Sequence, residues 1–205
     1  MSRFNLKTGD LLLFDYKKKG LFGVFTSAIK YFTHSEFSHI AMVLKDPTFL
    51  HPSLKGYYVW ESSWEGKPDP QDGKIKLGVQ ITPFEEIYNA YKNDKSSIFV
   101  RRISKNSEKF FTPENLEDIH KVVYDKPYDI VPKDWLEAAF GKDSNPQKTD
   151  RFWCAALVGY IFTKCNILKY DTDWSKLSPS DFSSEKNSVE FINDVSLEPK
   201  EEQIL

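Results

Sequence analysis

Residues 151–168 read RFWCAALVGYIFTKCNIL, and almost every position is apolar whichever face of a helix is considered. A helix that is apolar all round is buried in the core of a domain. The stretch therefore predicts a buried helix, with Thr149 or Asp150 as its candidate cap residue. Cys154 lies in its first turn, whereas Cys165 lies late in the helix and is expected to be a core residue.

Short apolar runs earlier in the chain predict the strands that accompany this helix. They cover residues 10–14, 38–44, 57–62 and 98–102. Apolar residues at helical spacing predict a helix over residues 20–33. Thr82, followed by Pro83 and then Glu85, predicts a helix start with threonine as the cap, and Thr112-Pro113-Glu114 predicts the start of a further helix that runs to about residue 124.

The order of these elements predicts one α+β domain, expected to extend from residue 1 to residue 197. Gly, Pro and Asp predict a loop over residues 65–76 and a turn-rich segment over residues 125–150. The polar, acidic residues 198–205 predict a flexible C-terminal tail.

The composition argues against several classes of protein. Hydrophobic residues make up 40% and aromatic residues 15% of the 205 residues, which argues against a disordered chain. The formal net charge is -2 with both signs scattered, which argues against nucleic-acid binding. Residues 1–7 contain no apolar run of a secretory signal, and no run reaches the length of a membrane span, so we expect a cytoplasmic protein. The two cysteines are too far apart along one helix for a disulfide.

Cys154 is the candidate nucleophile. The unpaired N–H groups and the dipole at a helix N-terminus favour a thiolate there. The alternative from local sequence is a buried core cysteine, because free cysteines are often fully buried.

The chain offers four histidines as a base for this thiol: His34, His39, His51 and His120. His39 is the best candidate because it begins a predicted strand, and a strand root fixes a side chain better than a loop does. A purely structural histidine remains the alternative.

Glu61 is the candidate for the group that orients this histidine. It ends the strand predicted from Tyr57, beside aromatic neighbours, where a carboxylate usually has a partner. The alternative is a strand-end glutamate that faces water.

Seven segments, in chain order, resemble the permuted branch of the NlpC-type papain-like cysteine hydrolases. This branch includes or adjoins the YiiX-like proteins, poxvirus-type homologues and lecithin:retinol acyltransferase. The segments are Thr8–Leu13, Phe32–Val43, Val59–Ser63, Gly78–Val79 with Pro83–Phe84, Lys126–Asp129, Phe152–Val158 and Leu177–Phe182. One departure from the family pattern is Ala155-Ala156, where many relatives have Ser-Glu.

The resemblance implies a circularly permuted papain-like fold, in which a small antiparallel sheet packs on a buried helix that carries the cysteine. It implies a thiol hydrolase of the peptidase or amidase type with a triad of Cys154, His39 and Glu61. The expected reaction is cleavage of an amide bond, in a peptide or isopeptide, or of an acyl bond, through a thioester. No metal or other cofactor is expected, because the histidines and cysteines lack zinc-ligand spacing.

Two other functions stay open at this point. One is an acyltransferase that passes the acyl group to a lipid or amine acceptor, and the other is a non-catalytic binding module on the same fold. The expected partner is a small peptide, amide or acyl-lipid substrate and no nucleic acid. Contact of residues 20–33 with a membrane surface is weighed, but packing of their aromatic side chains on the sheet is preferred. The oligomeric state is left open.

Overall fold

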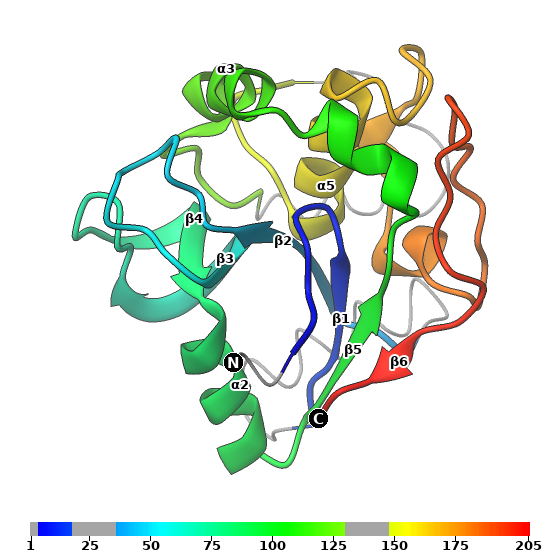
Figure 1. The fold of residues 1–205 in the computed structure, drawn as a ribbon. Helices are drawn as coiled ribbons and strands as arrows, with labels where there is room; N and C mark the ends of the chain where they lie inside the picture. Colours follow the sequence, from blue (N-terminus) through cyan, green and yellow to red (C-terminus); the bar gives the residue numbers. More distant parts are fainter. Residues whose placement is uncertain (1–3, 18–35, 130–147) are drawn as a thin grey trace.

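The computed structural model describes residues 4–17, 36–129 and 148–205. Within them, six strands form one antiparallel sheet in the order β4-β3-β2-β1-β5-β6 (Figure 1). The strands are β1 (Leu11–Asp15), β2 (His39–Lys45), β3 (Tyr57–Pro68), β4 (Ile75–Pro83), β5 (Ser97–Arg101) and β6 (Glu202–Gln203). The α-helices are α2 (Phe84–Asn93), α3 (Pro113–Val123) and α5 (Cys154–Lys164), and the 3-10 helices are η1 (Lys105–Phe110), η2 (Trp174–Lys176) and η3 (Pro179–Phe182). The expected α+β class is therefore confirmed.

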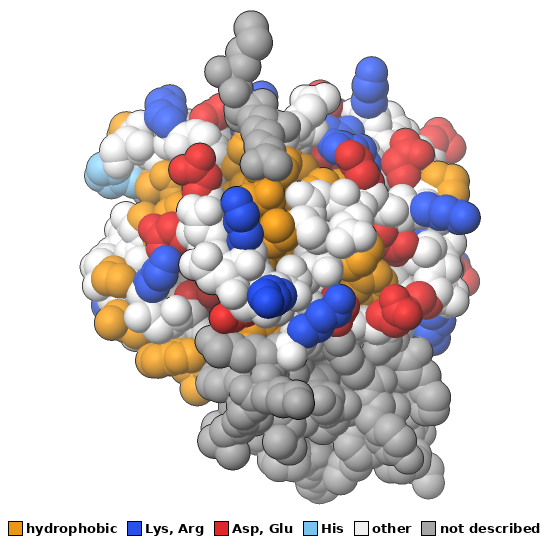
Figure 2. All heavy atoms as spheres, turned by 90° about the horizontal axis from the view of Figure 1, so that it is seen from below, with side chains coloured by type: hydrophobic (Ala, Val, Ile, Leu, Met, Phe, Trp, Pro, Cys, Tyr) orange, Lys and Arg blue, Asp and Glu red, His pale blue; other side chains and the backbone are white. Residues whose placement is uncertain are grey.

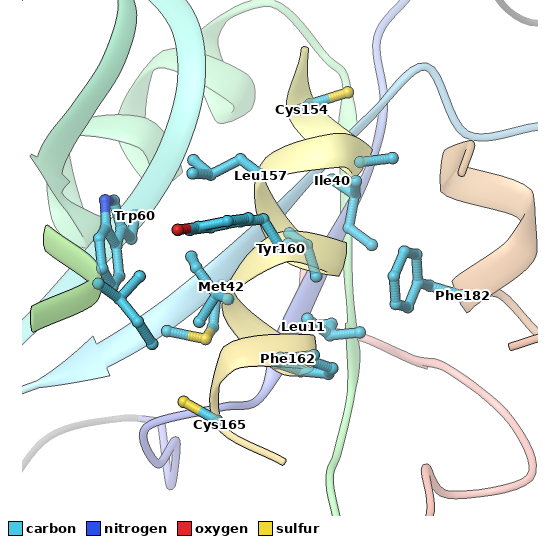
Figure 3. Packing of buried hydrophobic residues seen from close by; sticks show 14 of the residues in the cluster. Leu11, Ile40, Met42, Trp60, Cys154, Leu157, Tyr160, Phe162, Cys165 and Phe182 are labelled. Atoms are coloured by element: carbon cyan, nitrogen blue, oxygen red, sulfur yellow. The ribbon is translucent and has the colours of Figure 1, made fainter. Parts of the chain in front are cut away.

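Both faces of the sheet are covered. Successive side chains of a strand point to opposite sides, so β1 contributes to two cores. Leu11 and Leu13 belong to a large core shared with α3 and α5. Leu12 and Phe14 belong to a second core shared with α2. Figure 3 shows the first of these cores, where Met42 of β2 lies against Tyr160 of α5. Among the described residues, no helix is long and apolar enough to cross a membrane.

The buried helix is shorter than the sequence predicts. It begins at Cys154 and not at residue 151, with Trp153 at the N-cap position. Thr149 and Asp150 are therefore not its caps. The prediction of a helix buried on all sides is confirmed, since every residue from Cys154 to Thr163 is buried. Cys165 immediately follows the helix and is fully buried, as expected.

The hairpin of β3 and β4 corrects a predicted loop. Its strands reach Pro68 and start again at Ile75, so half of residues 65–76 are strand. The glycine and proline content of this stretch concealed a strand whose outer half is mostly exposed. The turn between the strands is held by Lys76, whose Nζ lies 2.9 Å from Asp69 and 2.8 Å from Asp72.

The two helix starts predicted at threonine-proline pairs have different outcomes. The helix α3 begins at Pro113 as predicted, and the Thr112 hydroxyl caps it by accepting a hydrogen bond from the Asn115 backbone N–H. Thr82 is not a cap, because it belongs to β4 and α2 begins after Pro83 without a side-chain cap. The Thr82 hydroxyl instead donates to a buried carboxylate of the neighbouring strand.

The end of the chain lies against the sheet. In the expected tail of residues 198–205, β6 pairs with β5, and the backbone N–H of Ile204 donates to the Ile98 carbonyl. The buried Arg101 side chain donates to the Glu198 carbonyl. On the face shown in Figure 2, acidic and basic side chains are intermixed, and no broad field of one sign is seen. The helix expected over residues 20–33 lies outside the described residues.

Candidate active site

Cys154 is the first residue of α5. The preceding Trp153 is extended, with φ -89° and ψ 173°, and no side chain of the described residues caps the helix. The first backbone N–H groups of a helix have no acceptor within it, so those at Cys154 point out of the helix end. Figure 3 shows Cys154 at this end and Cys165 past the other. The cysteine side chain therefore sits where partial positive charge is concentrated.

The position of this helix end is fixed by packing on both sides of the cysteine. The Ser62 hydroxyl of β3 donates to the Phe152 carbonyl over 2.6 Å. The rings of Phe152 and Tyr160 lie against Trp174 of η2, with centroids 5.6 and 5.3 Å from it. At Gly159 an added Cβ would lie 2.9 Å from the Trp174 Cβ, so glycine permits this close approach. Movement of α5 along its axis would disturb all of these contacts.

His39 is the first residue of β2, as the sequence predicts within one residue. It pairs with Phe14 of β1, and the two rings lie 5.2 Å apart. The imidazole is 17% exposed, so it is held by the sheet but reachable from solvent. Its Nε2 lies 2.8 Å from Oε2 of Glu61.

Glu61 lies within β3 and not at its end, and its side chain is only 1% exposed. Both carboxylate oxygens have partners, because Oε1 accepts a hydrogen bond from the Thr82 hydroxyl over 2.9 Å while Oε2 meets His39. The register pairs Met42 with Trp60, so His39 and Glu61 are diagonal neighbours on one face of the sheet. The strands β2 and β3 are antiparallel, and only the predicted place of Glu61 at the end of its strand is wrong, since β3 continues to Pro68.

Cys154 lies beside His39, close enough for its side chain to act on the imidazole. Because Nε2 meets Glu61, Nδ1 is the ring nitrogen left for the thiol. Burial by itself would lower the pKa of His39, but the hydrogen bonds to Cys154 and Glu61, and the negative charges of both groups, raise it to about 10. The structure thus brings together the three residues selected from the sequence, and at neutral pH the imidazole carries a positive charge.

The remaining histidines and the second cysteine lie elsewhere. His51 is exposed, with Nδ1 2.7 Å from the Ser53 hydroxyl. His120 bonds to Gln71, and burial lowers its pKa to about 4. Burial raises the pKa of Cys165 to about 12, which makes this thiol unreactive at neutral pH. His34 lies outside the described residues.

Three side chains near the Cys154–His39 pair were not selected from the sequence. The charges of Cys154 and Glu65 both act on Tyr91 of α2, and the charge of Cys154 acts on Tyr128. Burial first, and then these charges, raise the pKa of both tyrosines well above the usual value, so both phenols stay protonated. Only Tyr128 carried a sequence signal, since it lies in a segment that resembles the hydrolase family.

The arrangement can form a nucleophilic thiolate beside a charged imidazole that a buried carboxylate orients. Within residues 4–17, 36–129 and 148–205, no three His, Cys, Asp or Glu side chains gather in a way that could hold a metal ion. No protein-family model matches the chain, and a search of curated proteins finds no match.

Proposed function

We propose that this protein is a cysteine hydrolase that cleaves an amide or acyl bond through a thioester on Cys154. One observation carries the proposal: His39 contacts Cys154 on one side and Glu61 on the other, with Nε2 2.8 Å from the carboxylate. A structural histidine needs only one such partner. A nucleophile, its base and an orienting acid in series are the parts that thiol catalysis requires.

In the first half of the reaction, the Cys154 thiolate attacks the carbonyl carbon of the substrate, and a carbon–sulfur bond forms. The His39 imidazolium gives its proton to the leaving amine or alcohol as the carbon–nitrogen or carbon–oxygen bond breaks. In the second half, neutral His39 takes a proton from water, which attacks the thioester. The Cys154 thiolate leaves as the acid product forms. The thiolate and the charged imidazole are then both back in their starting state.

The charge that develops on the carbonyl oxygen needs donors close to the sulfur. The backbone N–H groups at the uncapped start of α5 supply them, with the helix dipole in the same direction. The protonated Tyr128 phenol is a further candidate, because its segment runs beside Phe152 through a parallel bridge. The buried Glu61 holds the imidazole orientation throughout and stabilises its charged form.

We also propose that the fold is the circularly permuted papain-like one. The order of elements supports this, because the strand that carries His39 precedes the helix that carries Cys154. The antiparallel sheet packs on that helix, as the resemblance implies. Circular permutation leaves the chemistry unchanged, because the relative positions of the side chains and not their order in the chain determine it.

The test is an acylation experiment on the folded, full-length chain with p-nitrophenyl acetate. We expect a burst of p-nitrophenol and an acetyl group on Cys154 by peptide mass mapping. Cys165→Ala is the matched control and should show the same burst, whereas Cys154→Ala should show none. Equal labelling of folded wild-type and Cys154→Ala protein would refute the proposal.

The same experiment identifies the acyl acceptor. With water alone, the thioester should decay to acetate and free enzyme, which is hydrolysis. If added amines or alcohols collect the acetyl group in preference to water, the enzyme is an acyltransferase that uses the same thioester.

A further inference from the structure

The strand that carries Glu61 extends past the start of its neighbour. β2 begins at His39, whereas β3 continues to Pro68. Continuing the register that pairs Met42 with Trp60 puts Ser63 across from His39. Glu65 lies beyond the end of β2, in the stretch between Trp64 and Pro68 where the pairing of β3 with β4 shifts its register, and its hydrogen bond with the Ser63 hydroxyl keeps the carboxylate on the His39 side.

The charge of Glu65 is poorly compensated. Its Oε1 accepts a hydrogen bond from the Ser63 hydroxyl over 2.5 Å. Burial raises the pKa of Glu65, and the charge of Glu61 raises it further, against smaller lowering effects of Ser63, His39 and Lys67, to about 7. Lys67 is half exposed, and its Nζ lies 2.8 Å from Oε2 of Glu86. Glu86 therefore competes with Glu65 for the positive charge of Lys67. A cationic group placed beside Glu65 would relieve this imbalance.

Aromatic rings line the same face. Tyr91 of α2 lies 5.0 Å from Phe14 and 5.9 Å from Tyr16, and Phe14 in turn lies 5.2 Å from His39, each between ring centroids. The charges of both Glu65 and Cys154 raise the pKa of Tyr91, so this ring lies within the electrostatic reach of the carboxylate and of the nucleophile. A neutral aromatic face beside a carboxylate is the chemistry that binds organic cations.

A second polar group on this face is unsatisfied. Gln80 of β4 is directly across from Glu61 in the register and is 1% exposed. Its Nε2 has no hydrogen-bond partner among the described residues. Buried donors are rarely left without an acceptor. His39 hydrogen-bonds to the Glu61 carboxylate and not to the Gln80 amide.

We propose that Glu65 is a specificity-determining residue, and that it selects substrates with an ammonium or guanidinium group next to the bond that Cys154 attacks. The inference rests on the proposed function and names the substrate class for the same site. Glu65 contributes the negative charge, and Tyr91 contributes the ring face. The extension of β3 past β2 holds the carboxylate on the substrate side of His39.

The test compares small thiol reagents that share one reactive group and differ in charge. Methyl methanethiosulfonate is neutral, and its trimethylammonioethyl and sulfonatoethyl analogues are cationic and anionic. Rates of Cys154 modification at pH 8 are measured by peptide mass mapping on the folded full chain. Glu65→Gln should lower the ratio of the cationic to the neutral rate about fivefold, because one nearby charge is removed. Glu65→Asp keeps the charge and should retain most of the ratio.

Glu85→Gln is the matched control, because it removes one exposed carboxylate from α2 and should leave the ratio unchanged. An unchanged ratio in folded Glu65→Gln, with thioester formation intact, overturns the cation preference and leaves the hydrolase standing. If Cys154 reacts with the neutral reagent no faster than Cys165 and forms no thioester, the hydrolase and the cation preference are both overturned. A fall of the ratio in Glu85→Gln equal to that in Glu65→Gln also overturns the assignment, because it would reflect total charge alone.

Discussion

Replacement of Glu61 by glutamine tests the contact on which the proposed chemistry depends most. The substitution keeps the shape of the side chain and an oxygen that can accept from Thr82, so the fold should be retained. It removes the negative charge 2.8 Å from the His39 ring. An opposite charge this close moves a pKa by about 1–3 units.

The expected magnitude follows from the environment of His39. Its pKa of about 10 is reached against the effect of burial, with Cys154 and Glu61 both raising it. Loss of the Glu61 charge should lower the pKa of His39 by about 1.5, which corresponds to about 2 kcal/mol in favour of the neutral ring. An equal loss in the transition state would slow turnover roughly thirtyfold, and loss of the fixed tautomer extends the expected range from about tenfold to a thousandfold.

The assay is an NMR titration of the imidazole through long-range proton–nitrogen correlations, with His39→Asn to assign the signal. Turnover of p-nitrophenyl acetate is measured in parallel, and Glu85→Gln serves as the control for loss of one carboxylate. An unchanged His39 pKa in a folded Glu61→Gln protein would refute the role of Glu61. The contact between Cys154 and His39 could survive that result, but the triad could not.

Further outcomes follow from the other contacts. Iodoacetamide should modify Cys154 at least about a hundredfold faster than Cys165 at pH 7.5, because burial raises the pKa of Cys165 to about 12, and equal rates by mass mapping would contradict this. Thr82→Val should lower the free energy of unfolding in urea by about 1.5–3 kcal/mol, because a buried carboxylate loses its donor. Glu65 has a folded pKa of about 7 against 4.5, so wild-type stability is lost as pH rises between these values, and Glu65→Gln should gain up to about 3 kcal/mol at pH 8 relative to pH 4 in urea unfolding. Deletion of residues 202–205 should lower the unfolding midpoint, because β6 covers the edge of β5.

Periodicity and cap residues predicted much of the architecture. β1, β2 and β5 lie within one residue of their predicted positions, because short apolar runs bounded by turns leave few alternatives. The cap at Thr112 was also predictable, because its partner is the backbone three residues later.

Signals whose partners lie far away in sequence were misread. The Thr82-Pro83 pair suits a helix start, but threonine also favours strands, and only the neighbouring Glu61 shows which role applies. The face shared by Glu61 and Glu65 depends on the register of β2 with β3, which composition does not fix. His39 and Cys154 were selected by position and resemblance, and their contact required the folded sheet.

The site draws together residues 39, 61 and 154, which are widely separated along the chain. Contacts of such long range close large loops, and we expect them to form late in folding, after the local hairpin of β3 and β4. We therefore expect the cysteine to remain an ordinary thiol while the chain is being made, with its base still absent. Chemical reactivity would arise only with completion of the fold, so an unfinished or truncated chain would carry no active nucleophile.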